Sequence, residues 1–170
     1  MAIQIKFKGS PINLEGELPD IGAEAPDFKV VSQDMKDVSL PDFRGKVKVI
    51  TSFPSLDTPV CDLQVRQFNE RASGFSSDVV VLGISKDLPF AQKRFCELNG
   101  IKNVRVLSDY KYSSFGKNYG LLIKELQLLA RSVLIVDKND VVRYVQVVEE
   151  LTEQPDYEEI LSNLGKITGE

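Results

Sequence analysis

The sequence predicts a three-layer α/β domain built on a mixed β-sheet. Strand-like and helix-like segments alternate through the middle of the chain, and the chain closes with a β-hairpin and a final helix, an order typical of this class. The run 78–85 is almost continuously apolar, as expected of a central strand that is buried on both faces. The sequence shows no internal repeat and no interior linker, so we expect one domain over residues 1–170.

The N-terminal part is predicted to begin with a hairpin. Residues 3–7 and 12–18 alternate between apolar and polar side chains around the turn at 8–11, which is the pattern of paired strands. A loop and two short strands follow, and residues 46–53 form the first strong β run. The next helix begins at Pro59 and is expected to end near Gly74, since glycine favours the position just past a helix C-terminus.

The second helix is predicted to follow the strand at 78–85. Asp87 is a suitable N-cap, and Gly100 is a suitable stop signal. Ala91, Phe95 and Leu98 recur at helical spacing and form an apolar stripe on one face of this helix, with Cys96 one step around from it.

Most of the C-terminal half has clear signals. The expected elements are a strand at 104–107, a helix from Ser113 or Ser114 to about Gly120, a hairpin of strands 132–136 and 141–148, and a last helix that opens at Pro155. Residues 121–130 favour a helix by propensity, although they run directly into the strand at 132–136.

Composition narrows the function classes. The chain is 42% apolar and 27% charged with a net charge of −4, and it has no basic cluster, which argues against nucleic acid or anionic membrane as a partner. No segment is an apolar run long enough to span a bilayer, and residues 1–6 lack a signal-peptide pattern. We therefore expect a cytoplasmic protein.

The sequence has no histidine, and this excludes several chemistries at once. Cys-His proteases, Ser-His-Asp hydrolases and most zinc sites all need that residue. Two cysteines alone cannot close a zinc site, and Cys61 is not part of a Cys-x-x-Cys dithiol. We expect no metal and no cofactor, so any catalysis has to come from a thiol, a hydroxyl, a carboxylate or an amine.

Cys61 is predicted to lie in the first turn of a helix. Thr58 is a good N-cap residue, and Pro59 fits the first helical position, where its missing N–H costs nothing. Unpaired backbone N–H groups and the positive end of the helix dipole then face the thiol, and both favour the thiolate. This position is typical of a nucleophilic cysteine.

A second interpretation uses the same helix. Cys61, Val65, Phe68 and Ala72 recur at i, i+4, i+7 and i+11, which is the spacing of a core-facing stripe. Free cysteine is often buried and inert. From helix spacing alone, Cys61 could be a structural core residue.

The pattern Pro54-x-x-x-Thr58-x-x-Cys61 resembles the active-site signature of the peroxiredoxins, and the fuller match is to the thiol peroxidase branch. The resemblance covers essentially the whole chain, including the N-terminal hairpin, Cys96, residues 130–132 and residues 149–157. It implies a thioredoxin-like fold with a mixed central sheet, flanking helices and an N-terminal hairpin.

By this resemblance, the peroxidatic cysteine is Cys61, the resolving cysteine is Cys96, the family's arginine is Arg131, and its threonine and proline are Thr58 and Pro54. The chemistry would be reduction of hydrogen peroxide and organic hydroperoxides, followed by a Cys61–Cys96 disulfide that thioredoxin reduces. The branch is typically homodimeric. Both cysteines are predicted on helices, so the disulfide requires local fraying, which we expect around Cys96.

Two other functions compete with this one. A cysteine phosphatase needs Cys-x5-Arg, whereas Arg66 is one residue too close to Cys61 and no glycines line the loop. A redox-sensing or chaperone-like protein could use the same disulfide switch without turnover, and the sequence disfavours that alternative only weakly.

Overall fold

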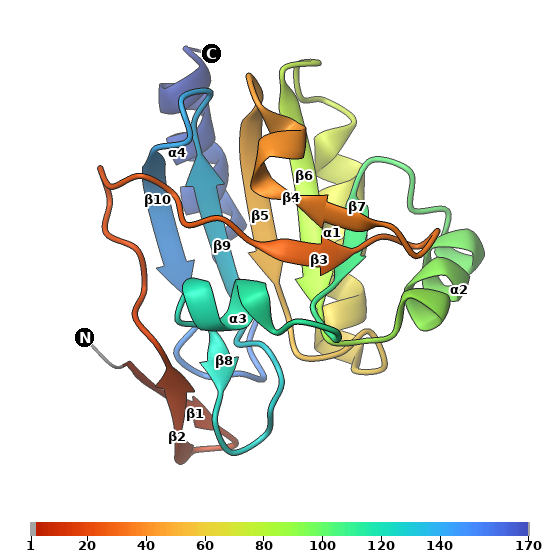
Figure 1. Ribbon diagram of the computed structural model, residues 1–170, viewed down its shortest axis with the longest axis vertical. Helices are drawn as coiled ribbons and strands as arrows, with labels where there is room; N and C mark the ends of the chain where they lie inside the picture. The colour runs from red at the N-terminus through yellow and green to blue at the C-terminus, as the bar shows by residue number, and fades with distance from the viewer. Residues whose placement is uncertain (1–2, 170) are drawn as a thin grey trace.

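The computed structural model describes residues 3–169, and its main feature is a mixed β-sheet with helices on both faces (Figure 1). The strands of this sheet are β3 (Lys29–Val31), β4 (Asp37–Ser39), β5 (Val47–Ser52), β6 (Val79–Ser85), β7 (Arg105–Ser108), β9 (Ser132–Val136) and β10 (Val142–Val147). Their order across the sheet is β10-β9-β5-β6-β7-β3-β4. β5, β6 and β7 are parallel, and the other neighbours pair antiparallel, so the predicted mixed sheet is confirmed.

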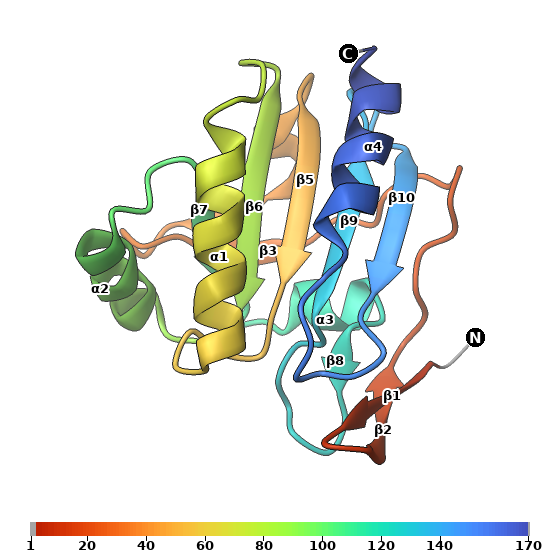
Figure 2. The same cartoon turned by 180° about the vertical axis from the view of Figure 1, so that it is seen from behind.

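The helices divide between the two faces of this sheet. They are η1 (Leu40–Phe43, a 3-10 helix), α1 (Pro59–Ala72), α2 (Pro89–Asn99), α3 (Ser114–Asn118) and α4 (Tyr157–Thr168). α1 and α4 lie side by side on one face, α3 lies on the other, and α2 lies beyond the β7 side of the parallel strands (Figures 1 and 2). Successive side chains of β9 point to opposite faces of the sheet, so Val133 packs in the core under α1 and α4, and Leu134 packs in the core on the other face.

The N-terminal hairpin is confirmed, and it belongs to a separate small sheet. β1 (Gln4–Phe7) pairs with β2 (Ser10–Glu15), and β2 pairs with β8 (Leu122–Ile123). The predicted helix at 121–130 is therefore wrong. Gln127 has a φ of 55°, which reverses the chain, and Leu122 and Leu129 pair across that reversal. Pairing with β2 outweighs the helix propensity of this segment.

α2 has the predicted position but presents a different face to the core. Gln92 and Cys96 are buried, whereas Ala91 is exposed and Leu98 is 77% exposed. Gln92 determines this orientation, because its Nε2 donates to the main-chain oxygen of Leu107 in β7 at 2.9 Å. The predicted apolar face is therefore wrong for Ala91 and Leu98, whereas Phe95 is half-buried and packs against the core. A buried side-chain hydrogen bond turns the polar Gln92 inward.

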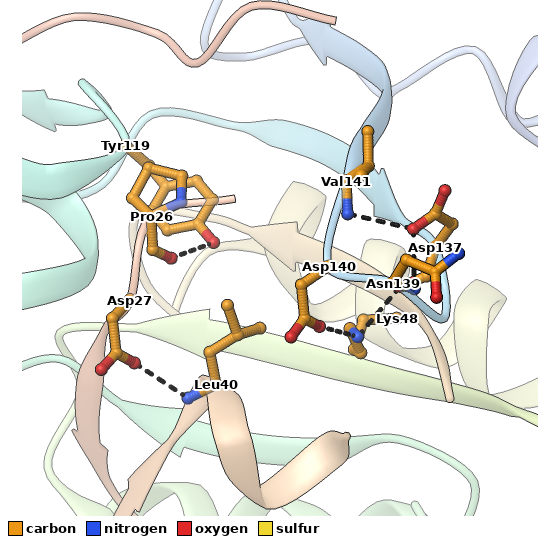
Figure 3. Close-up of polar contacts among 9 residues, drawn as sticks. All are labelled: Pro26, Asp27, Leu40, Lys48, Tyr119, Asp137, Asn139, Asp140 and Val141. Carbon is orange, nitrogen blue, oxygen red and sulfur yellow. Dashed lines mark hydrogen bonds and ion pairs between the residues drawn. The ribbon is translucent and has the colours of Figure 1, made fainter. Parts of the chain in front are cut away.

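β5 carries a lysine that the rest of the fold surrounds. Lys48 is fully buried, and its Nζ donates to the main-chain oxygen of Asp137 at 3.1 Å and lies 2.5 Å from Oδ1 of Asp140, in the β9–β10 turn (Figure 3). A buried ammonium group needs such partners. This ion pair therefore ties the turn of the C-terminal hairpin to the central strand.

We expect Asp140→Asn to lower the free energy of unfolding by about 2 kcal/mol, because it leaves the Lys48 ammonium without a counter-charge. Asparagine tolerates the φ of 61° at this position, so backbone strain stays the same. In a Lys48→Met background the same substitution is expected to cost less than about 0.5 kcal/mol. Urea unfolding of the four proteins measures this, and an equal cost in both backgrounds would rule out the charge as the cause.

Candidate active site

The predicted helix start around Cys61 is confirmed. Thr58 is the N-cap with extended backbone angles, and Pro59 is the first helical residue. The main-chain N–H of Cys61 donates to Oγ1 of Thr58 at 3.3 Å. Cys61 is also fully buried on the stripe that contains Val65 and Phe68. Cys61 thus lies in the first turn of the helix and also belongs to its core-facing stripe.

Asp87 holds the loop that leads into α1. Its carboxylate accepts hydrogen bonds from Oγ of Ser55 at 2.8 Å, from the main-chain N–H of Leu56 at 2.9 Å and from Oγ of Ser85 at 2.6 Å. The N-cap of α2 is Leu88, so the prediction that Asp87 caps this helix is wrong. Asp87 instead fixes the loop before Cys61 to the end of β6.

Arg131 lies immediately before β9 and is 2% exposed. Its Nε and Nη2 donate to the main-chain oxygen of Leu151 at 3.1 and 2.8 Å, and its Nη1 donates to Oε1 of Gln64 at 2.6 Å. A guanidinium has five N–H groups, so these bonds leave two of them free for a ligand. The guanidinium of Arg131 is therefore held in a fixed orientation, and two of its N–H groups remain available to a ligand.

Gln64 is a site residue that sequence reasoning missed. It lies on α1, three residues after Cys61, and is fully buried. Its Nε2 donates to Oγ1 of Thr51 at 2.5 Å and to the main-chain oxygen of Ser52 at 3.2 Å, while its Oε1 receives Arg131. A glutamine beside an apolar stripe was the available signal, because buried polar side chains need specific partners.

The guanidinium of Arg131 has no negative partner among residues 3–169. The salt bridges of this part of the chain involve other residues, and the acceptors of Arg131 are neutral. Burial raises the pKa of the nearby Tyr157 to about 12, although the charge of Arg131 opposes this, so the phenol is neutral at pH 7. A buried cation without a counter-ion favours binding of an anion.

A pocket of about 150 Å³ opens beside Arg131. Its walls are Phe7, Pro54, Ser55, Thr58, Val60, Leu126, Leu128, Arg131, Leu151 and Thr152. Pro54, Thr58 and Arg131 are thus three of the five predicted site residues, and one mostly apolar pocket brings them together. The side chain of Cys61 is buried at the start of α1. Its main-chain N–H bonds to Thr58, which lines the pocket, so Cys61 lies next to the pocket.

Cys96 lies in a different place. It is 8% exposed on α2 and lines a second pocket of about 320 Å³. Gln33 donates to its Sγ from 3.4 Å, and burial raises the pKa of the thiol, although this hydrogen bond opposes the shift. Both cysteines are free thiols on intact helices, and they share an apolar cluster, but Cys61 lines neither of the two pockets described above.

Comparison with known proteins identifies the family. A family model described as Redoxin matches residues 20–161. The thiol peroxidase of Oceanobacillus iheyensis is 48% identical over 162 residues, which are 95% of this chain and 98% of the relative. This chain belongs to the peroxiredoxin family, in its thiol peroxidase branch. The thiol peroxidase of Bacillus subtilis is 50% identical to this peroxiredoxin over 155 residues, 91% of this chain and 92% of the relative.

Solved structures agree with this assignment. A peroxiredoxin-like protein from Aquifex aeolicus superposes on this peroxiredoxin with a TM-score of 0.91 at 41% identity, covering 96% of each chain. A thiol peroxidase from Chromobacterium violaceum has the same fold, with a TM-score of 0.85 at 21% identity and the same coverage. The predicted thioredoxin-like fold is confirmed. No helix among the described residues combines the length and apolar character that crossing a membrane requires.

Proposed function

We propose that this peroxiredoxin is a thiol peroxidase in which the thiolate of Cys61 reduces hydrogen peroxide and organic hydroperoxides. The observation that carries the proposal is the buried guanidinium of Arg131, which has two free N–H groups and no carboxylate partner among residues 3–169, in the wall of a pocket at the helix start of Cys61. The thiolate is the anion that this cation favours. The thiolate sulfur bonds to one peroxide oxygen, the O–O bond breaks, and the other oxygen leaves and takes up a proton.

Arg131 serves both ends of this step. Its charge stabilises the thiolate, and its free N–H groups can donate to the leaving oxygen as negative charge develops. Thr58 contributes through the helix: its Oγ1 receives the N–H of Cys61, and its own hydroxyl donates to the main-chain oxygen of Ser55 at 3.1 Å. Contact between this hydroxyl and a peroxide would require it to turn away from Ser55. Pro54 lines the pocket, and we propose that its apolar ring limits access of water.

The product at Cys61 is a sulfenic acid, and we propose that Cys96 resolves it. The Cys96 sulfur attacks the Cys61 sulfur, water leaves, and a disulfide forms that thioredoxin reduces. A disulfide needs Cα atoms within about 7 Å, and both cysteines lie on formed helices, so we propose that α2 frays locally to bring Cys96 to Cys61. Its exposed apolar face and its position beside β7 favour α2 as the mobile element. We further propose that the protein is a cytoplasmic homodimer.

Turnover distinguishes this enzyme from a redox sensor or a chaperone-like protein that uses the same disulfide. With thioredoxin, thioredoxin reductase and NADPH, we expect NADPH oxidation to continue for many equivalents of cumene hydroperoxide per chain. A sensor would consume one equivalent and stop. Linear consumption that depends on thioredoxin supports the proposal, whereas a single stoichiometric burst contradicts it.

A further inference from the structure

The segment after β10 is joined to the N-terminal hairpin by main-chain hydrogen bonds. The N–H of Lys6 donates to the oxygen of Glu149 at 2.7 Å, and the N–H of Leu151 donates to the oxygen of Lys6 at 2.8 Å. Lys6 and Glu150 therefore form a short parallel bridge. The hairpin is packed at this end of the molecule, below the central sheet in both views (Figures 1 and 2).

The side chain of Glu150 adds a second connection. Its Oε1 accepts the N–H of Gly9 at 2.8 Å, and its Oε2 accepts the N–H of Lys8 at 3.3 Å. Oε2 also accepts the N–H and the hydroxyl of Thr152 at 3.0 and 2.9 Å. These bonds, led by those from the backbone of Thr152 and Gly9, lower the pKa of Glu150 to about 2. The carboxylate thus links the hairpin turn to the segment after β10.

Both linked segments contribute to the wall of the pocket beside Arg131. Phe7, which precedes the hairpin turn, lines the pocket, as do Leu151 and Thr152. The main-chain oxygen of Leu151 also holds the guanidinium of Arg131. Glu150 therefore links the segment that contains Phe7 to the segment in which Leu151 orients the guanidinium.

We propose that Glu150 is a positioning residue that holds the Phe7 wall of the pocket in place, and that this wall determines how well the enzyme uses bulky organic hydroperoxides relative to hydrogen peroxide. The inference rests on the proposed function. An aromatic hydroperoxide gains binding energy from an apolar wall, whereas hydrogen peroxide has no apolar group to place there.

Glu150→Ala and Phe7→Ala test the wall from its two sides. We expect each to lower kcat/KM for cumene hydroperoxide by about 5- to 10-fold, with kcat/KM for hydrogen peroxide and kcat at saturating peroxide within about twofold of wild type. Glu149→Gln is the matched control. Glu149 is a neighbouring carboxylate whose ion pair with Lys6, at 3.8 Å, is exposed, so its substitution should leave both peroxides unaffected.

The ratio of the two kcat/KM values separates positioning from loss of folded protein, since misfolding lowers both values equally. An unchanged ratio in folded Glu150→Ala or in Phe7→Ala, or an equal change in Glu149→Gln, would overturn the inference. If Glu150→Ala does not fold, as judged by circular dichroism, Glu150→Gln takes its place in the comparison. If the wild-type protein consumes neither peroxide, the proposed function itself is wrong. If the variants react with hydrogen peroxide at a normal rate and the ratio is unchanged, only the inference about the wall is wrong.

Discussion

Cys61→Ser is expected to abolish peroxide reduction, lowering the second-order rate constant for cumene hydroperoxide by at least about 10⁴-fold. A serine hydroxyl stays protonated at neutral pH, and no histidine is present in the sequence to act as its base. The helix start and Arg131 favour an anion that serine cannot supply. Competition kinetics or stopped-flow mixing with peroxide measures the rate constant directly.

Cys96→Ser is the matched control for this substitution, because it removes the other thiol and leaves the first step intact. We expect it to react with one equivalent of peroxide at the wild-type rate and then to stall without a resolving thiol. Retention of more than a tenth of the wild-type rate in Cys61→Ser would show that Cys61 is a core residue and not the nucleophile. Thermal unfolding checks that both variants are folded.

Arg131→Met is expected to lower the same rate constant by about 10²- to 10³-fold. Methionine fills the space of the arginine stem but removes the charge that favours the thiolate and the N–H groups that meet the leaving oxygen. Arg131→Lys should recover part of this loss, since it restores a cation without the planar fork that Leu151 and Gln64 bind. The measurement is the rate constant as a function of pH.

Rate and folding together separate a catalytic role of Arg131 from a structural one. A rate within threefold of wild type at neutral pH would contradict the role assigned to Arg131. Loss of activity at every pH together with loss of the folded state would point to a structural role for this buried side chain instead.

Local chemistry explains what the sequence could predict. Thr58, Pro59 and Cys61 are adjacent, and N-cap and first-turn preferences act over only a few residues, so the helix start follows from the sequence alone. The buried strand at 78–85 is equally local and matches β6. Arg131 was found by resemblance, since a single arginine before a strand carries no signal of its own.

Contacts between distant segments explain what the sequence could not predict. β8 forms where helix propensity is high, because Leu122 and Ile123 complete the sheet of the N-terminal hairpin. α2 turns Gln92 inward, because β7 offers it a main-chain acceptor. Propensity and periodicity describe a segment by itself, and tertiary pairing outweighs them in both places.

The supporting residues of the site depend on the same kind of contact. Gln64 and Arg131 are 67 residues apart, and Asp87 lies 31 residues from the loop that it holds. No spacing rule links such residues before the register of β5, β6 and β9 is known. Glu150 reaches even further, to Gly9 across 141 residues of the chain.

The most direct test of Cys61 as the attacking thiolate is the intact mass of the protein after one equivalent of cumene hydroperoxide and alkylation of the remaining thiols. Wild type should lose two hydrogen atoms and take no label, whereas Cys96→Ser should gain one oxygen on Cys61. Cys61→Ser should remain unoxidised and take its label on Cys96. Oxidation of Cys61→Ser as fast as wild type would contradict the account, because the peroxide would then be reacting at another residue.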